Sequence, residues 1–133
     1  MTVRKVHADV ETAFEVLNSR LPSSLEKVDS SRNKSFIYLS VIEAYLILGK
    51  FRDAIKMNED MKNCKVCSKF YDEGLLTIGR YYEKKGNYDS AVDFYQRAIE
   101  ASFDTDSDRI REWARSGLDR MITKSLGETE LGN

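Results

Sequence analysis

The stretch from Leu75 to Ala98 reads LLTIGRYYEKKGNYDSAVDFYQRA, and residues 38–61 repeat its pattern. The two copies share apolar, aromatic, glycine and small residues at matching places, namely Val41 and Ile78, Tyr45 and Tyr82, Gly49 and Gly86, Phe51 and Tyr88, and Ala54 and Ala91. Each pair is separated by the same offset (86 − 49 = 37). A glycine in the middle of each copy is typical of the stop between two helices. The sequence therefore predicts one helix–turn–helix unit that occurs twice.

The later copy resembles a tetratricopeptide repeat, whose pattern is W-x2-L-G-x2-Y, then A-x3-F, then P. The matching residues are Ile78-Gly79 for L-G, Tyr82 for the tyrosine, and Ala91 with Tyr95 for A-x3-F, while Leu75 stands at the tryptophan and Phe103 near the proline. Gly86-Asn87-Tyr88 resembles the turn between the two helices of the family's repeat.

The earlier copy departs further from the family's pattern. Ile42 stands at the small-residue position and Asn58 at the aromatic position, and Met61 replaces the small residue that Ala98 represents in the later copy. The family's repeat has about 34 residues, so the 37-residue offset adds about three. The segment from Lys62 to Lys69, between the hairpins, is the expected place for them.

The resemblance implies an all-α fold in which antiparallel helix hairpins stack as a short right-handed solenoid of about six helices. Apolar stripes at helical spacing also predict a helix before and after the two hairpins. The expected organisation is one domain over 1–126, with repeat units at about 35–68 and 72–105, capping helices at about 3–20 and 108–126, and a frayed tail at 127–133.

Composition limits the classes of partner. The chain has 133 residues, of which 32% are charged and 41% hydrophobic, with a net charge of −1 and one proline. This composition is typical of a helical globular protein and favours neither nucleic acid nor a membrane surface as a partner. Two cysteines do not form a disulfide framework, and no apolar run approaches the roughly 20 residues of a membrane helix. We therefore expect a cytoplasmic protein.

The inventory of reactive residues argues against an enzyme. His7 is the only histidine, so neither a pair of histidine ligands nor a second base is present. No serine lies in a strand–turn–helix elbow, and the glycines are single residues within helical patterns. We expect no catalytic residues and no cofactor.

The segment Cys64-Lys65-Val66-Cys67 has the most specific chemical pattern of the chain. A redox pair of this kind typically follows a strand and opens a helix, and no strand is predicted upstream. A zinc site would need four ligands, so Cys64 and Cys67 would have to join the same pair from a second copy. We expect ordinary thiols, with that shared metal site as the alternative.

The residues one step from the core stripe of each first helix are the candidates for binding a partner. These are Phe36, Leu39, Glu43 and Leu46, followed by Leu76, Arg80 and Glu83. In the tetratricopeptide repeat family this side of the first helix lines a concave groove. The resemblance thus implies a protein-binding module, adaptor or co-chaperone-like, that takes an apolar peptide or an amphipathic helix. Chaperone-binding members hold terminal carboxylates with Lys, Asn and Arg, and here Arg80 alone fits that cluster.

Two other occupants of this groove stay open. The chain's own N-terminal helix could fill it, or a second copy could, in which case the protein is a structural self-associating unit. A homodimer with a metal site at Cys64 and Cys67 is the corresponding alternative function.

Overall fold

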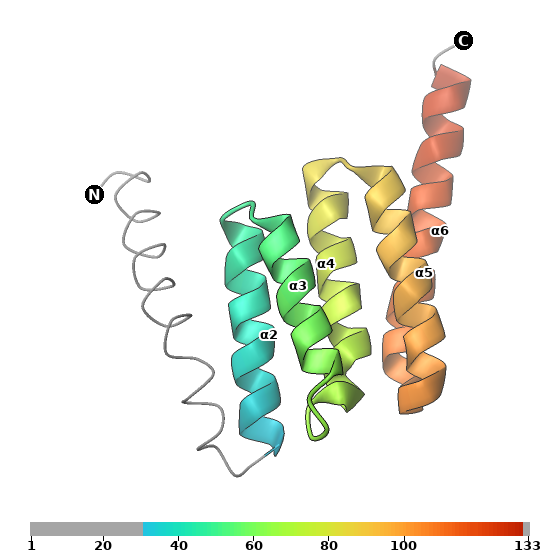
Figure 1. Cartoon of the computed structure of the whole chain (residues 1–133). Coiled ribbons are helices and arrows are strands. Elements are labelled where there is room, and N and C mark those ends of the chain that lie inside the picture. Colours follow the sequence, from blue (N-terminus) through green and yellow to red (C-terminus); the bar gives the residue numbers. More distant parts are fainter. Residues whose placement is uncertain (1–30, 132–133) are drawn as a thin grey trace. The chain divides into compact units, whose positions relative to one another are not determined.

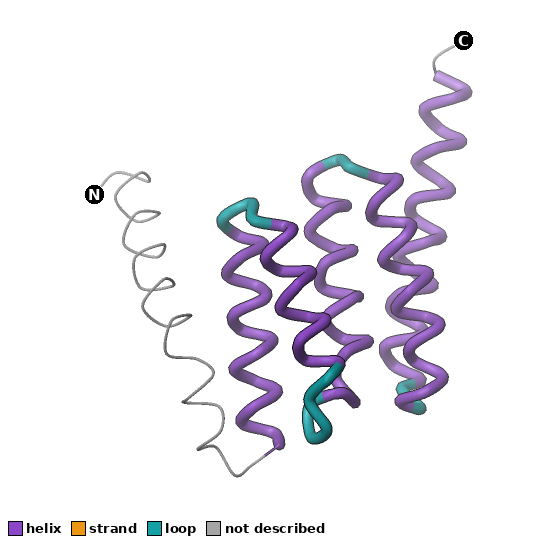
Figure 2. Tube along the Cα trace, viewed as in Figure 1, coloured by secondary structure: helices purple, strands orange, loops and turns teal. Residues whose placement is uncertain are grey.

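The computed structural model describes residues 31–131, and every regular element in that range is a helix (Figure 1). The elements are α2 (Ser31–Ile47), α3 (Phe51–Lys62), the 3-10 turn η1 (Ser68–Phe70), α4 (Tyr71–Lys85), α5 (Tyr88–Thr105) and α6 (Asp108–Leu131). Short loops join them, and no strand occurs between residues 31 and 131 (Figure 2). The all-α prediction is confirmed with five of about six expected helices. The predicted helix over 3–20 lies outside the described residues.

The helix bounds agree closely with the repeat pattern and differ mainly at the C-terminal ends. α5 ends at Thr105, as the predicted repeat unit does, whereas α6 continues to Leu131 rather than to about Leu126. No proline interrupts this extension. Gly127 lies within α6, where a single glycine costs about 1 kcal/mol of helix propensity relative to alanine and does not by itself end a helix.

The chain forms two compact units that divide between Ser68 and Lys69. In the first unit, α2 packs against α3. In the second, α5 packs against both α4 and α6, and α4 also contacts α6. The repeat unit predicted at 72–105 therefore lies in the second compact unit. The stacking of the hairpins as a right-handed solenoid and the single domain over 1–126 stay predictions.

The turn between α2 and α3 is closed by a pair of backbone hydrogen bonds around Gly49. The Gly49 N–H donates to the carbonyl of Leu46 (N···O 3.0 Å), and the Lys50 N–H donates to that of Tyr45 (2.8 Å). Gly49 has a φ of +77°, in the left-handed region that residues with a Cβ rarely adopt. This pairing is a Schellman motif, which satisfies carbonyls at the end of α2 and turns the chain into α3.

The turn between α4 and α5 repeats this motif 37 residues later. Gly86 has a φ of +83°. Its N–H donates to the backbone carbonyl of Glu83 (N···O 3.0 Å), and the Asn87 N–H donates to that of Tyr82 (3.0 Å). Asn87 is the N-cap of α5, and its side-chain oxygen accepts from the Ser90 N–H. The sequence repeat is thus also a repeat of backbone conformation, which supports the hairpin prediction at atomic detail.

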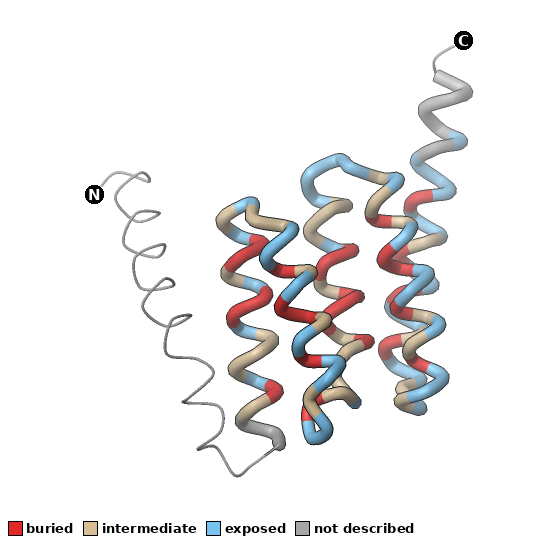
Figure 3. The backbone as a smooth tube through the Cα atoms, in the orientation of Figure 1, coloured by how far each residue is buried: buried red, intermediate tan, exposed pale blue. Residues whose placement is uncertain are grey.

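The core of the second unit is organised around the ring of Tyr95 on α5. A Cβ added to Gly79 on α4 would lie 3.0 Å from this ring, and one added to Gly117 on α6 would lie 2.6 Å from it. Both glycines therefore allow a neighbouring helix to approach α5 closely. Ala91 and Ala98, one turn before and nearly one turn after Tyr95, are fully buried and keep the same face of α5 small. Buried residues recur along all three helices of the unit (Figure 3).

In the first unit the larger apolar residue lies on the first helix of the hairpin and the smaller residue on the second, the reverse of the second unit. Ile42 on α2 occupies the position of Gly79, and Asn58 on α3 occupies that of Tyr95. Ile42 and Asn58 are both buried. A larger residue on the first helix thus accompanies a smaller one on the second, which is the compensation that a close-packed interior requires when one partner changes. This explains how the first copy keeps the hairpin while it departs from the family's pattern.

The packing of Tyr95 gives a testable prediction for Gly117→Ala. The added methyl group would overlap the tyrosine ring, and overpacking of this kind costs about 1–3 kcal/mol. The better helix propensity of alanine recovers at most about 1 kcal/mol. We expect a lower midpoint of urea unfolding. The matched control is Ser116→Ala, at an exposed neighbouring position of α6, for which a change within about 0.5 kcal/mol is expected. A higher midpoint for Gly117→Ala would contradict this account of the core.

Candidate partner-binding surface

The four groove residues predicted in the first unit lie along α2 and differ in exposure. Phe36 is 71% exposed, Glu43 is exposed and Leu39 is half-buried, whereas Leu46 is only 3% exposed. The expectation that Leu46 lies off the core is therefore not met. α2 carries apolar residues on most of its circumference, and a single core stripe cannot be read reliably from such a helix.

In the second unit, Leu76, Arg80 and Glu83 follow one another at i, i+4 and i+7 along α4. This stripe faces α6, because the Arg80 guanidinium lies over the ring of Trp113 and Glu83 binds Arg120. Leu76 is 1% exposed and belongs to the core. The expected exposure of this leucine is also not met. The repeat pattern assigned this side of α4 to an open groove, but α6 contacts it at Arg80 and at Glu83.

Trp113 is the one aromatic residue of α6, and 41% of its surface is accessible. The guanidinium carbons of Arg80 on α4 and Arg109 on α6 each lie 5.2 Å from the centre of a Trp113 ring. Both arginines are themselves exposed. The site thus joins an aromatic surface to two cations from different helices, an arrangement that cation–π attraction stabilises.

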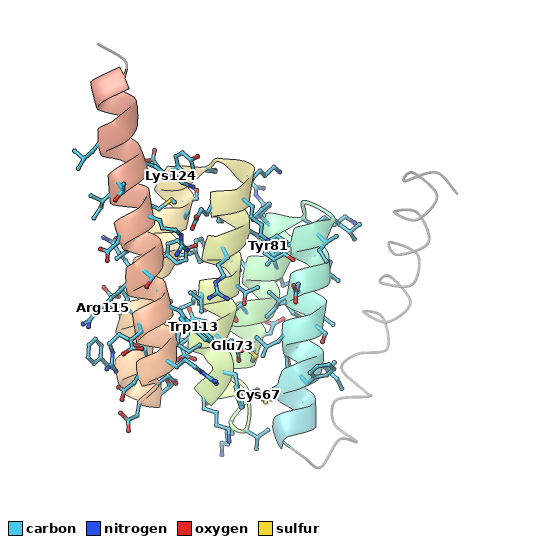
Figure 4. The ribbon with its side chains drawn as sticks, turned by 180° about the vertical axis from the view of Figure 1, so that it is seen from behind. Cys67, Glu73, Tyr81, Trp113, Arg115 and Lys124 are labelled. Atoms are coloured by element: carbon cyan, nitrogen blue, oxygen red, sulfur yellow. The ribbon has the colours of Figure 1, made fainter. Side chains whose placement is uncertain are left out.

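Glu73 lies beside this cluster on the first turn of α4 (Figure 4). Burial raises the pKa of Glu73 above its ordinary value, and the neighbouring Asp72 raises it further, while Arg109 and Arg80 partly offset these effects. The two arginines are therefore close enough to Glu73 for their positive charge to affect its ionisation. We call Glu73, Arg80, Arg109 and Trp113 the tryptophan surface.

Sequence reasoning predicted Arg80 as a binding residue but missed Trp113 and Arg109. Trp113 lies on an apolar stripe of the predicted capping helix at about 108–126, together with Ile110 and Ala114. The one repeat-like feature near it is the spacing of Trp113 and Gly117, which are four apart as at the opening of a repeat. That spacing puts Trp113 at the position of Leu75, which is buried, so it predicts a core residue and not the exposed ring that the structure shows.

Glu83 takes part in a second cluster that ties α4, α5 and α6 together. The Tyr95 hydroxyl donates to Glu83 Oε1 (2.6 Å), and Arg120 donates from Nε to Oε2 and from Nη2 to Oε1 (3.1 Å each). Lys124 Nζ lies 3.6 Å from Oε2. Burial alone raises the pKa of Glu83, but hydrogen bonds from Arg120 and Tyr95 outweigh it, so this pKa lies below the ordinary 4.5. Glu83 is thus held between helices rather than open to a ligand.

Asp72 and Thr105 link the two ends of the α4–α5 hairpin. Asp72 is buried, its Oδ2 accepts from the Thr105 hydroxyl (2.7 Å), and its Oδ1 accepts from the Glu73 N–H (2.8 Å). The second bond satisfies one of the free amides at the start of α4. The contact closes the open end of the hairpin, opposite the Gly86 turn.

The region between this aspartate and this threonine matches a known family. A tetratricopeptide repeat profile matches residues 72–105. The first and last residues of this match are Asp72 and Thr105, which the hydrogen bond joins. This part of the chain is thus a tetratricopeptide repeat. Comparisons with curated proteins and with solved structures found no match.

Tetratricopeptide repeats generally mediate protein–protein interactions, and the family typically consists of non-enzymatic interaction modules. None of the helices in the described part of the chain is long and apolar enough to cross a membrane. Within the same residues, no group of three or more His, Cys, Asp or Glu side chains could hold a metal ion, and Cys64 and Cys67 are free thiols.

The lowered pKa of Glu83 gives a prediction about acid stability. A carboxylate whose pKa is lower in the folded state stabilises the fold above its unfolded-state pKa and loses that contribution as the pH falls through the folded value. We expect the free energy of unfolding of Glu83→Gln to lie below that of the wild type at pH 7, with a smaller difference at pH 3. Urea unfolding at both pH values measures it.

The control is Glu112→Gln, at an exposed position of α6. It should change the free energy of unfolding by no more than about 0.5 kcal/mol at either pH. An equal difference at pH 7 and pH 3 for Glu83→Gln would mean that the ionised carboxylate does not join the three helices.

Proposed function

We propose that this tetratricopeptide repeat protein is a non-enzymatic adaptor that holds a segment of a partner protein on the tryptophan surface. The observation that carries the proposal is the exposed Trp113 ring with Arg80 and Arg109 5.2 Å from its ring centres. Tryptophan and arginine are enriched among the residues that dominate the free energy of protein–protein binding. Both residue types lie here on two adjacent helices of one compact unit.

The chemistry of the surface favours an amphipathic segment with both apolar and acidic side chains. The Trp113 ring offers an apolar contact, and the exposed guanidinium groups of Arg80 and Arg109 can each bind a carboxylate through two hydrogen bonds. An amphipathic helix presents such residues on one face at i, i+3 and i+4. The proposal keeps Arg80 from the predicted groove and replaces Leu46 and Leu76, which are buried, with Trp113 and Arg109.

Phe36 and Leu39 remain a separate candidate surface in the first unit. Phe36 is among the most exposed large apolar side chains of the described residues, and Leu39 is half-buried less than one turn further along α2. Exposed apolar side chains that gather on one helix face often mark an interaction site. The proposal includes a cytoplasmic location, which rests on the small number of cysteines.

The experiment compares two exposed aromatic residues that each lie under an arginine. Trp113→Ala removes the ring of the tryptophan surface, and Phe103→Ala removes a 59% exposed ring on α5 that lies 3.9 Å from the Arg111 guanidinium. Affinity capture with the wild-type chain supplies the partner, and the Kd of that partner is then measured for each variant. Truncation of a dominant residue costs about 2 kcal/mol or more, which is roughly a 30-fold loss of affinity.

We expect that loss for Trp113→Ala and for the double variant Arg80→Ala with Arg109→Ala, and a change of less than about threefold for Phe103→Ala. Circular dichroism of each variant controls for folding. An equal loss for Phe103→Ala, or an unchanged Kd for Trp113→Ala, would move the binding site away from this surface.

A self-associating unit is the second candidate function. Ile122 and Leu126, one turn apart on α6, are 56% and 60% exposed. Such a pair on one helix face can be buried by a second copy. Sedimentation at low micromolar concentration should then give the mass of a dimer for the wild type and of a monomer for Ile122→Lys. A wild-type monomer rules this function out at that concentration.

A further inference from the structure

Cys64 and Cys67 lie in one tight turn at the end of the first compact unit. The Cys64 N–H donates to the carbonyl of Met61 (3.1 Å), which extends the end of α3 by a final turn. The Cys67 N–H and the Ser68 N–H then both donate to the carbonyl of Cys64 (3.1 and 2.8 Å). Three backbone hydrogen bonds therefore fix the conformation of the segment that separates the two cysteines.

This turn holds the cysteines at a separation that suits a disulfide. A four-residue turn with a hydrogen bond from the fourth residue to the first has its end Cα atoms less than about 7 Å apart. Disulfides join cysteines whose Cα atoms are about 4.4–6.8 Å apart. Neither a strand nor a helix N-terminus is needed for this proximity, because the backbone hydrogen bonds of the turn supply it.

The two thiols have different environments, as an attacking and a resolving cysteine would. Cys64 is partly exposed, whereas Cys67 is fully buried. Burial alone would raise the pKa of Cys64, but hydrogen bonds from the Cys67 thiol and from the amides of Val66 and Cys67 lower it below the ordinary 9.0, and Lys34 adds to this. Burial, followed by the hydrogen bond to Cys64, raises the pKa of Cys67 to about 11.

Other groups around the pair leave this order unchanged. The Ser35 side chain hydrogen-bonds to Cys67, which opposes the rise of its pKa without reversing it. Tyr38 and Asp60 lie near the two cysteines, and burial and these neighbours raise the pKa of the Tyr38 hydroxyl, so that Tyr38 is neutral. Cys64 is thus the more acidic thiol of the pair, and the Cys67 thiol donates a hydrogen bond to its sulfur.

We propose that Cys64 and Cys67 form a thiol–disulfide exchange site whose oxidant is a disulfide of low molecular mass, such as glutathione disulfide. The Cys64 thiolate attacks one sulfur of the oxidant, so that a mixed disulfide forms on Cys64, the oxidant's sulfur–sulfur bond breaks, and one thiolate leaves. Cys67 then releases its proton to solvent and attacks the Cys64 sulfur. The Cys64–Cys67 bond forms and the second thiolate leaves.

The overall reaction is balanced. The protein dithiol gives up two electrons and two protons, and the oxidant is reduced to two thiols. The proposal assigns to this turn a reversible covalent change, and it is independent of the tryptophan surface, which belongs to the other compact unit.

The test uses the full chain, reduced, freed of metal with a chelator, and then incubated with glutathione disulfide. Intact mass should show a wild-type chain that carries no glutathione and has lost two hydrogen atoms, and peptide mapping without reductant should show the Cys64–Cys67 link. Cys67→Ser should stop at the mixed disulfide, with one glutathionyl group on Cys64. The serine hydroxyl keeps a hydrogen-bond donor beside that thiolate.

Cys64→Ser is the matched variant and should react far more slowly. Burial raises the pKa of Cys67, and this cause persists in Cys64→Ser, although the part of the rise that comes from Cys64 is lost. Burial also keeps the Cys67 sulfur away from the oxidant. We therefore expect glutathionylation of Cys64→Ser to be at least about tenfold slower than that of Cys67→Ser. Because Cys67 is buried, Cys67→Ala serves as a second variant should serine disturb folding.

Three results would overturn the proposal. One is a wild-type chain that accumulates glutathione on Cys64 without the internal disulfide. Another is a Cys64→Ser variant that reacts as fast as Cys67→Ser. The third is a wild-type chain that stays reduced, and if stoichiometric zinc added to that chain then binds at the two cysteines, the turn is a metal site.

Discussion

The second compact unit depends on one aromatic ring that fills the space left by two glycines. Tyr95 lies on the middle helix of the unit, with Gly79 of α4 and Gly117 of α6 so close that a methyl group on either would meet its ring. Because the ring lies between these two helices, its hydroxyl can also reach Glu83. Burial and this carboxylate raise the pKa of Tyr95, which keeps the hydroxyl a donor at neutral pH. Tyr95 thus sets the distance between the helices and also holds the Glu83 carboxylate that joins them.

The two hairpins show which parts of the repeat are required for a shared backbone. Both keep the glycine at the end of the first helix, with the same pair of hydrogen bonds across the turn. The hairpin interface is less constrained, because Ile42 with Asn58 can replace Gly79 with Tyr95. A helix end with a positive φ accepts few residues, whereas a buried interface accepts any pair that fills its volume. The family profile matches the second hairpin, which has Gly79 and Tyr95 at its interface as the family's pattern does.

The candidate sites follow from what each unit leaves accessible. In the second unit Leu76 is buried and Glu83 is held by ion pairs to α6, whereas Arg80 is exposed beside Trp113. Charge and aromatic surface are therefore combined there, and an amphipathic partner segment matches both. In the first unit the turn after α3 separates a partly exposed thiol from a buried one. The tryptophan surface and the cysteine turn thus belong to different compact units, and a mutation can change one without the other.

The sequence by itself determined the helical class, the two hairpins and the positions of their turns. These features are local, because a glycine at a helix end and a stripe at helical spacing act within a few residues. Only the tertiary structure decided that Leu46 and Leu76 are buried, that Arg80 and Arg109 meet at Trp113, and that Asp72 binds Thr105. Residues such as Asp72 and Thr105 are far apart in the chain, and their contact depends on how whole helices pack. The spacing of apolar residues along one helix shows which face is apolar, but a neighbouring helix decides how much of that face, and of the polar residues beside it, stays open to a partner.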